Sequence, residues 1–88
     1  MRTGMARSLA VTLRTLHASG IHASAHITNE GRVLVWICDV QKRVADAAFF
    51  DLDRLAEAAE WLAAAALTHF PRSDFAKVQN LVTRALAH

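Results

Sequence analysis

The sequence predicts a single α+β domain, with elements in the order α-β-β-(β)-α-α and an antiparallel hairpin or three-stranded sheet packed on helices. Residues 21–28 alternate apolar with polar side chains, which is the period of a half-buried strand. Residues 32–39 form a β-branched, aromatic and apolar run typical of a central strand. The segments before and after these strands instead repeat their apolar residues at helical spacing. All 88 residues fit one domain with a modest core.

The first helix is expected over residues 5–19, and residues 1–4 are expected to fray. Its apolar residues recur every three or four positions and share one face: Met5, Leu9, Leu13 and Leu16. Arg7 and Arg14 project from the opposite side. Gly20 follows directly, where a glycine in the left-handed conformation commonly ends a helix.

The two strands form a hairpin around Asn29-Glu30-Gly31, because Gly31 suits the positive φ of a three-residue loop. If Thr28 faces Arg32, one face of the hairpin is wholly apolar and should join the core. The pairs on that face are Ala23 with Ile37, Ala25 with Val35, and Ile27 with Val33.

The other face of the hairpin mixes polar side chains with large apolar ones: His22, Ser24, His26, Thr28, Arg32, Leu34, Trp36 and Cys38. One interpretation is an exposed sheet face, on which Trp36 lies flat over Ser24 or is covered by a tail. The other is a recognition surface, because Trp at the centre of a mixed patch is a common interface anchor.

Residues 44–50 are predicted to add a third, antiparallel strand, although their alanines favour a helix. Asp51 is the expected N-cap of a second helix, over residues 52–69. Its apolar stripe consists of Leu52, Leu55, Ala59, Leu62, Ala66 and Phe70. Trp61 lies opposite this stripe, beside Glu57. Trp61 either packs under another helix or contacts a partner.

Pro71 ends the second helix, and Ser73 or Asp74 is expected to cap the third. The third helix has an apolar face of Phe75, Val78, Val82, Ala85 and Leu86. Along one edge it carries Lys77, Asn80, Arg84 and His88, the most coherent positive strip in the chain.

Composition limits the chemistry. The net charge is +2, which permits nucleic-acid binding without indicating it. The single cysteine, Cys38, leaves no intramolecular disulfide and no multi-cysteine zinc site. Asp51 and Asp53 are better explained as helix-start residues than as metal ligands. We find no nucleophile motif and no phosphate loop, so we expect no enzyme activity, no cofactor and no metal.

The longest apolar run, from Trp61 to Leu67, is far shorter than the ~20 residues of a membrane span. Arg7 and Arg14 interrupt any core of a signal peptide. The expected location is therefore cytoplasmic, without membrane association.

Residues 44–62 place a strand ending in Phe49-Phe50-Asp51 before a helix with Glu57 and Trp61. This layout resembles small anti-CRISPR inhibitor proteins of phages and other mobile elements. The resemblance implies a non-enzymatic inhibitor that blocks a nucleic-acid-handling effector complex, such as a CRISPR effector complex, by surface binding. The slightly basic charge argues against an acidic DNA mimic. No functional residue is carried over from that family.

Three functions are therefore open. The first is a protein-interaction module, whose candidate contact residues are Trp36, Leu34, His26, Arg32, Trp61 and Glu57. The second is a small nucleic-acid-binding protein that uses Arg7, Arg14, Lys77 and Arg84, with Trp36 as a stacking platform. The third is a structural subunit. A homodimer is expected, with Leu34 and Trp36 pairing across a two-fold axis.

Overall fold

The computed structural model describes the backbone of residues 2–87 and the side chains of residues 7–82 and 84–86. Its elements are α1 (Arg2–Ala18), β1 (Ala23–Ile27), β2 (Arg32–Cys38), β3 (Val44–Asp51), the 3-10 turn η1 (Leu52–Arg54), α2 (Leu55–His69) and α3 (Asp74–Ala87). This confirms the predicted α+β fold, including the third strand.

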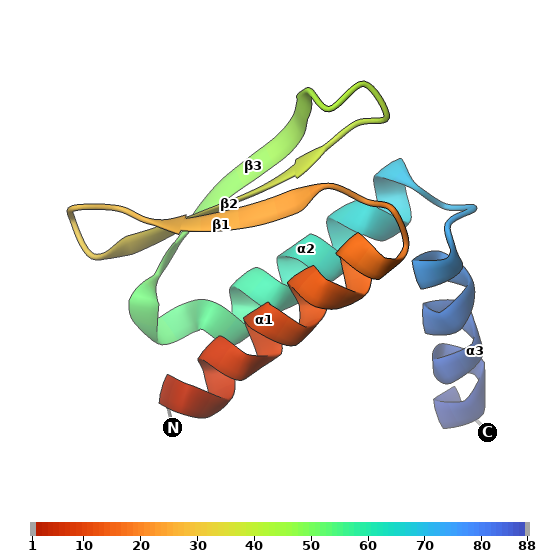
Figure 1. Ribbon diagram of the computed structural model, residues 1–88. Coiled ribbons are helices and arrows are strands. Elements are labelled where there is room, and N and C mark those ends of the chain that lie inside the picture. Colours follow the sequence, from red (N-terminus) through yellow and green to blue (C-terminus); the bar gives the residue numbers. More distant parts are fainter. Residues whose placement is uncertain (1, 88) are drawn as a thin grey trace.

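The molecule has two layers (Figure 1). The antiparallel sheet has the strand order β1-β2-β3, so the apolar strand β2 is central, as its sequence predicts. The helices α1 and α2 lie side by side under one face of this sheet, while the chain turns after α2 and α3 runs downward apart from the sheet, at the right of Figure 1. The result is a flat molecule of 40 × 34 × 17 Å. The opposite face of the sheet carries no helix in the described part of the chain.

Helix α1 begins at Arg2, so residues 2–4 are helical rather than frayed as expected. Extending an existing helix adds one hydrogen bond per residue without a new nucleation cost, which accounts for the earlier start. At its other end Gly20 adopts φ 78°. The N–H of Ile21 donates to Leu16 O at 2.9 Å and that of Gly20 to His17 O at 3.0 Å. These two bonds define the Schellman ending.

The hairpin register is confirmed. Ala23 pairs with Ile37, Ala25 with Val35, and Ile27 with Val33. Gly31 has φ 76°, and the Thr28 N–H donates to Arg32 O at 2.8 Å. One part of the prediction is wrong: Ile27 is 63% exposed. The tip of the hairpin extends past the helices (Figure 1), so its last apolar residue is left uncovered.

Strand β3 pairs with β2 from Arg32 opposite Asp51 to Cys38 opposite Val44, with an irregularity between Ile37 and Cys38. Pairing with a central strand overrides the helix preference of the alanines in β3. The expected cap is wrong in detail. Asp51 precedes η1 in an extended conformation, but its side chain makes no capping hydrogen bond. Instead, its carboxylate faces Arg32 across the strand pair.

The core consists of the apolar sheet face and the facing sides of the two helices. Leu16, Val35, Ile37 and Leu62 are fully buried. The second helix was expected from residue 52, but residues 52–54 form η1 and α2 begins at Leu55, so Leu52 lies outside the helix and is 37% exposed. Ala65, expected on the side opposite the apolar stripe, is buried, so the buried side of α2 is wider than the stripe predicts.

Helix α3 departs most from expectation. Ser73 caps it, accepting the Ala76 N–H at 3.1 Å. Of its predicted apolar face only Phe75, in the first turn, is buried; Phe75 and the neighbouring Ala76 are 3% and 1% exposed. Val78 and Leu86, on the same predicted face, are 55% and 83% exposed. The two helices already under the sheet leave α3 no position in the core.

Candidate protein-binding face

The uncovered face of the sheet is the candidate site, and we call it the outer face. Side chains alternate between the two faces of a strand, so the register determines its members. They are Ser24 and His26 from β1, Arg32, Leu34 and Trp36 from β2, and Ala47, Phe49 and Asp51 from β3. All four sheet residues proposed from the sequence as partner-binding, namely His26, Arg32, Leu34 and Trp36, therefore lie on one surface.

Trp36 occupies the middle of this face. Its cross-strand neighbours are Ser24 on β1 and Ala47 on β3, both small residues. No large side chain therefore lies directly across from the indole on either neighbouring strand, although the diagonal neighbours His26 and Phe49 are within reach of a large ring. Trp36 is half-buried. Ser24, over which the indole was expected to lie flat, is its register partner on β1, and no helix of the described residues covers this face (Figure 1).

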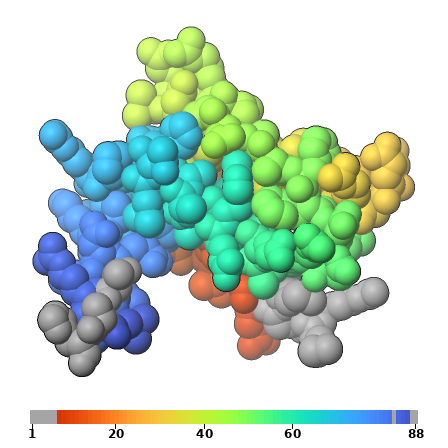
Figure 2. Space-filling model, turned by 180° about the vertical axis from the view of Figure 1, so that it is seen from behind, coloured from red at the N-terminus to blue at the C-terminus, as the bar shows by residue number. Residues whose placement is uncertain are grey.

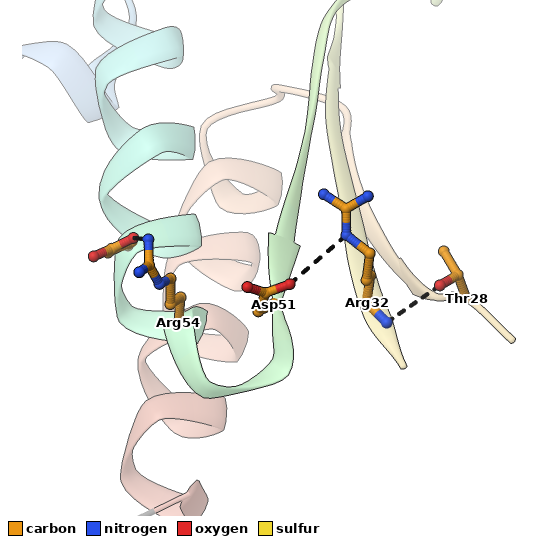
Figure 3. A network of polar contacts seen from close by, with 5 residues as sticks. Thr28, Arg32, Asp51 and Arg54 are labelled. Carbon is orange, nitrogen blue, oxygen red and sulfur yellow. Dashed lines mark hydrogen bonds and ion pairs between the residues drawn. The ribbon is translucent and has the colours of Figure 1, made fainter. Parts of the chain in front are cut away.

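Leu34 sits between His26 and Phe49. Phe49 is 51% exposed. The Arg32 guanidinium carbon lies 5.0 Å from the centroid of the Phe49 ring, which is a cation–π distance. Arg32 Nε is also 3.8 Å from Asp51 Oδ1, and its backbone N–H donates to Thr28 Oγ1 at 3.2 Å (Figure 3). A ring and a carboxylate thus orient the charged end of Arg32 while leaving it accessible.

Phe49 is the residue of this face that the sequence analysis missed. Phe49 and Phe50 are adjacent in a strand, so one must face the core and the other the outer face. Placing Asp51 opposite Arg32, a pairing of opposite charges, would have fixed the register and identified Phe49.

Trp61 and Glu57, the other two proposed contact residues, are not brought to the outer face. Trp61 packs against the core, with its ring centroid 6.3 Å from that of Phe50 and the two planes at 62°. Trp61 was expected either to pack under another helix or to contact a partner; in the structure it is partly buried, and its ring contact is with Phe50 of β3. Glu57 is exposed, and its Oε2 lies 3.8 Å from Arg54 Nη1, three residues earlier, in an ion pair.

The four basic residues considered for nucleic-acid binding are exposed but divided between two helices. Arg7 and Arg14 lie on α1, and Lys77 and Arg84 lie on α3. Both helices are on the side of the sheet away from Trp36 (Figure 1). The structure therefore does not combine the positive residues with the proposed stacking platform.

The histidines are dispersed. His17 Nε2 is 2.7 Å from Ala23 O, joining α1 to β1, and His69 lies 3.7 Å from Asp46 of β3. Among residues described by the structure, no three His, Cys, Asp or Glu side chains are grouped as metal ligands would be.

The turn between β2 and β3 is organised by Asp39. Its Oδ1 accepts the backbone N–H groups of Arg43 at 3.0 Å and Gln41 at 2.8 Å. The hydrogen bond from Arg43 is the main reason why the pKa of Asp39 is lowered from its ordinary value. This carboxylate has a structural role in the turn.

Comparisons of the chain with family models, curated proteins and solved structures gave no match. No helix in the described part of the chain has the length and apolar content needed to cross a membrane.

Proposed function

We propose that this chain is a small, non-enzymatic protein-interaction module that binds a protein partner through the outer face. The observation that carries the proposal is the position of Trp36. It lies half-buried at the centre of a sheet face without helices, with only the small residues Ser24 and Ala47 directly across from it.

The composition of the outer face agrees with this role. Trp and Arg dominate the binding energy of many interfaces, and they do so best at the centre of a patch. Here Trp36 is central, and Leu34 and Phe49 extend the apolar area along the strands. Arg32 is held at the margin by Phe49 and Asp51, so less side-chain entropy is lost on binding. His26 adds a polar group on the β1 side.

The first partner class to test is a nucleic-acid-handling effector complex, because residues 44–62 resemble small anti-CRISPR inhibitors. In this fold the Phe50 and Trp61 side chains of that segment contact each other. The resemblance therefore concerns internal packing, and the contact residues of the proposal come from the outer face instead.

The test is an affinity pull-down from the native host with three baits: wild type, Trp36→Ala and Val40→Ala. Val40 is the matched control, since it is 85% exposed in the β2–β3 turn and is not a member of the outer face. We expect a protein that wild type and Val40→Ala retain and Trp36→Ala loses. Binding of purified candidate effector complexes to the same three proteins should show at least a tenfold loss for Trp36→Ala alone. Equal retention by all three baits would refute the role of the outer face.

A matched assay separates protein binding from nucleic-acid binding. The variant Lys77→Gln/Arg84→Gln removes two charges from α3 and leaves the outer face intact. If the partner is a protein on the outer face, this variant binds as wild type does. Retention of wild type on DNA or RNA that falls steeply with salt, and falls further in this variant, would support the nucleic-acid alternative instead.

A further inference from the structure

A second apolar surface lies on α3. Beyond its first turn, four large apolar side chains are exposed: Val78 by 55%, Leu81 by 62%, Val82 by 46% and Leu86 by 83%. We call Val78, Leu81 and Val82 the α3 stripe. At roughly 100° per residue, these three share the side of the helix away from Ala76, which is buried. Such i, i+3, i+4 spacing is how a helix fills an apolar groove.

A matching concave surface lies at the opposite end of the molecule. Between α1 and the protruding hairpin is an apolar cleft of about 250 Å³, lined by Leu9, Leu13, Ala25, Ile27, Leu52 and Leu55 among others. Ile27, at its mouth, is 63% exposed. The cleft exists because the hairpin extends past the helices that cover the rest of the sheet (Figure 1).

The chain's own α3 does not reach this cleft. The cleft adjoins Leu55 at the start of α2. Helix α3 follows the other end of α2, which lies about 22 Å from the start because α2 has 15 residues. The middle of the α3 stripe, near residue 80, lies only about 9 Å from the start of α3, which is too short a distance to return to the cleft. The connection is a tight turn, in which the Ser73 N–H donates to Phe70 O at 3.2 Å. Figure 2 shows α3 in blue standing apart from α1 in red.

The chain exposes more surface than a folded monomer of its mass usually does, and the α3 stripe and the cleft are part of that surface. A monomer of 9.7 kDa is expected to expose about 5,100 Å², whereas this chain exposes 6144 Å². The excess of about 1,000 Å² is close to the roughly 800 Å² that each partner buries in a standard interface. A second copy supplies both missing surfaces, because each copy has one stripe and one cleft.

We infer that the chain forms a two-fold dimer in which the α3 stripe of each copy fills the apolar cleft of the other. The contact occurs twice, as closed symmetry requires. Pairing of α3 with its own copy is disfavoured by charge. Lys77 and Arg84 lie along one edge of the stripe, beside Leu81. In an antiparallel pair of α3 helices this edge of one copy faces the same edge of the other, so like charges would lie close together. This interface differs from the sheet-face dimer expected from the sequence and leaves the outer face accessible.

Sedimentation equilibrium tests the dimer with full-length variants. We expect wild type to dimerise at micromolar concentration, and Leu81→Asp and Ile27→Asp to weaken dimerisation at least tenfold. Both positions are exposed, so far-UV circular dichroism should show that the variants remain folded. Val40→Asp is the control and should dimerise normally, as should Trp36→Ala. A wild type that stays monomeric at several hundred micromolar overturns the inference. So does a dimer that only Trp36→Ala dissociates, which would place the interface on the outer face.

A crosslinking experiment tests the exchange itself. Ile27→Cys and Leu81→Cys are prepared as separate proteins in a Cys38→Ser background. On mixing under oxidising conditions, a disulfide-linked heterodimer should form at least tenfold faster than either homodimer. Preferential crosslinking of Leu81→Cys to itself would show α3–α3 pairing and overturn the assignment, as would the absence of a heterodimer.

Discussion

The two tryptophans should respond in opposite ways to the same substitution. Trp61 packs between α2 and β3, against the core and in an edge-to-face contact with Phe50. Trp36 lies on the outer face between small neighbours, so its removal opens no enclosed cavity. We therefore expect Trp61→Ala to impair folding stability and spare binding, and Trp36→Ala to impair binding with a smaller cost in stability.

The magnitudes follow from packing. Truncating a buried Trp costs about 3–5 kcal/mol, and an aromatic pair contributes about 0.5–1.5 kcal/mol beyond its buried area. Because Trp61 is only partly enclosed, we expect Trp61→Ala to lower the free energy of unfolding by about 2–4 kcal/mol. For Trp36→Ala, where only the transfer term applies, we expect about 1–2 kcal/mol. A chain of 88 residues has about 4–13 kcal/mol in total, so the first loss is a large fraction.

Urea unfolding, monitored by far-UV circular dichroism, measures this difference. Tryptophan fluorescence is unsuitable because each substitution removes one of the two fluorophores. All proteins are compared at one concentration, since dimerisation would add to apparent stability. Trp61→Phe is the matched control and should recover part of the loss by restoring a ring beside Phe50. The reasoning fails if Trp36→Ala destabilises the chain as much as Trp61→Ala does.

Three further predictions concern local structure. Gly31→Ala should destabilise by about 1 kcal/mol in urea unfolding, because Gly31 has φ 76° while an added Cβ would meet only Leu52 Cδ1 at 4.0 Å; an unchanged midpoint would show that the conformation carries no cost. Asp39→Asn should destabilise at pH 7. The pKa of Asp39 is lowered in the fold, so its contribution is present above the ordinary aspartate pKa of about 3.9 and is lost as pH falls through the lower folded value. The gap between variant and wild type should therefore close at acid pH in thermal unfolding, and a gap independent of pH contradicts this. Cys38, near the end of β2, should react slowly with a thiol reagent at neutral pH, and Cys38→Ser should leave folding intact; rapid labelling of the native protein would oppose that expectation.

The hairpin was predictable because its information is local. Alternation of apolar and polar side chains determines which residues share a face, and Gly31 determines where the chain reverses. The members of the outer face from β1 and β2 followed directly. Phe49 did not, because assigning it to a face requires the register between β2 and β3, which depends on tertiary pairing.

Helix packing was predictable only in part, for a related reason. The apolar periodicity of α2 identifies a buried side but not how wide that side is. In the structure Ala65 is also buried, and Trp61 contacts Phe50 of the third strand. In α3 the same periodicity predicts an apolar side that will be buried. It does not indicate whether this chain or another molecule covers that side. Val78 and Leu86 are exposed within this chain, and the inferred second copy would cover the α3 stripe.

The two proposed surfaces have a joint consequence. The outer face lies on one side of the sheet, whereas the cleft and α3 belong to the helical side (Figure 1). A dimer formed by α3 and the cleft would therefore present two outer faces at once. If two partner sites lie within the span of the dimer, the second binding event becomes intramolecular, and apparent affinity rises by about 10²–10⁴ without any new contact. Leu81→Asp should remove this gain while leaving the affinity of a single outer face unchanged. Comparing its binding to a monomeric and an immobilised multivalent partner separates the two effects: a loss on both would mean that α3 touches the partner directly.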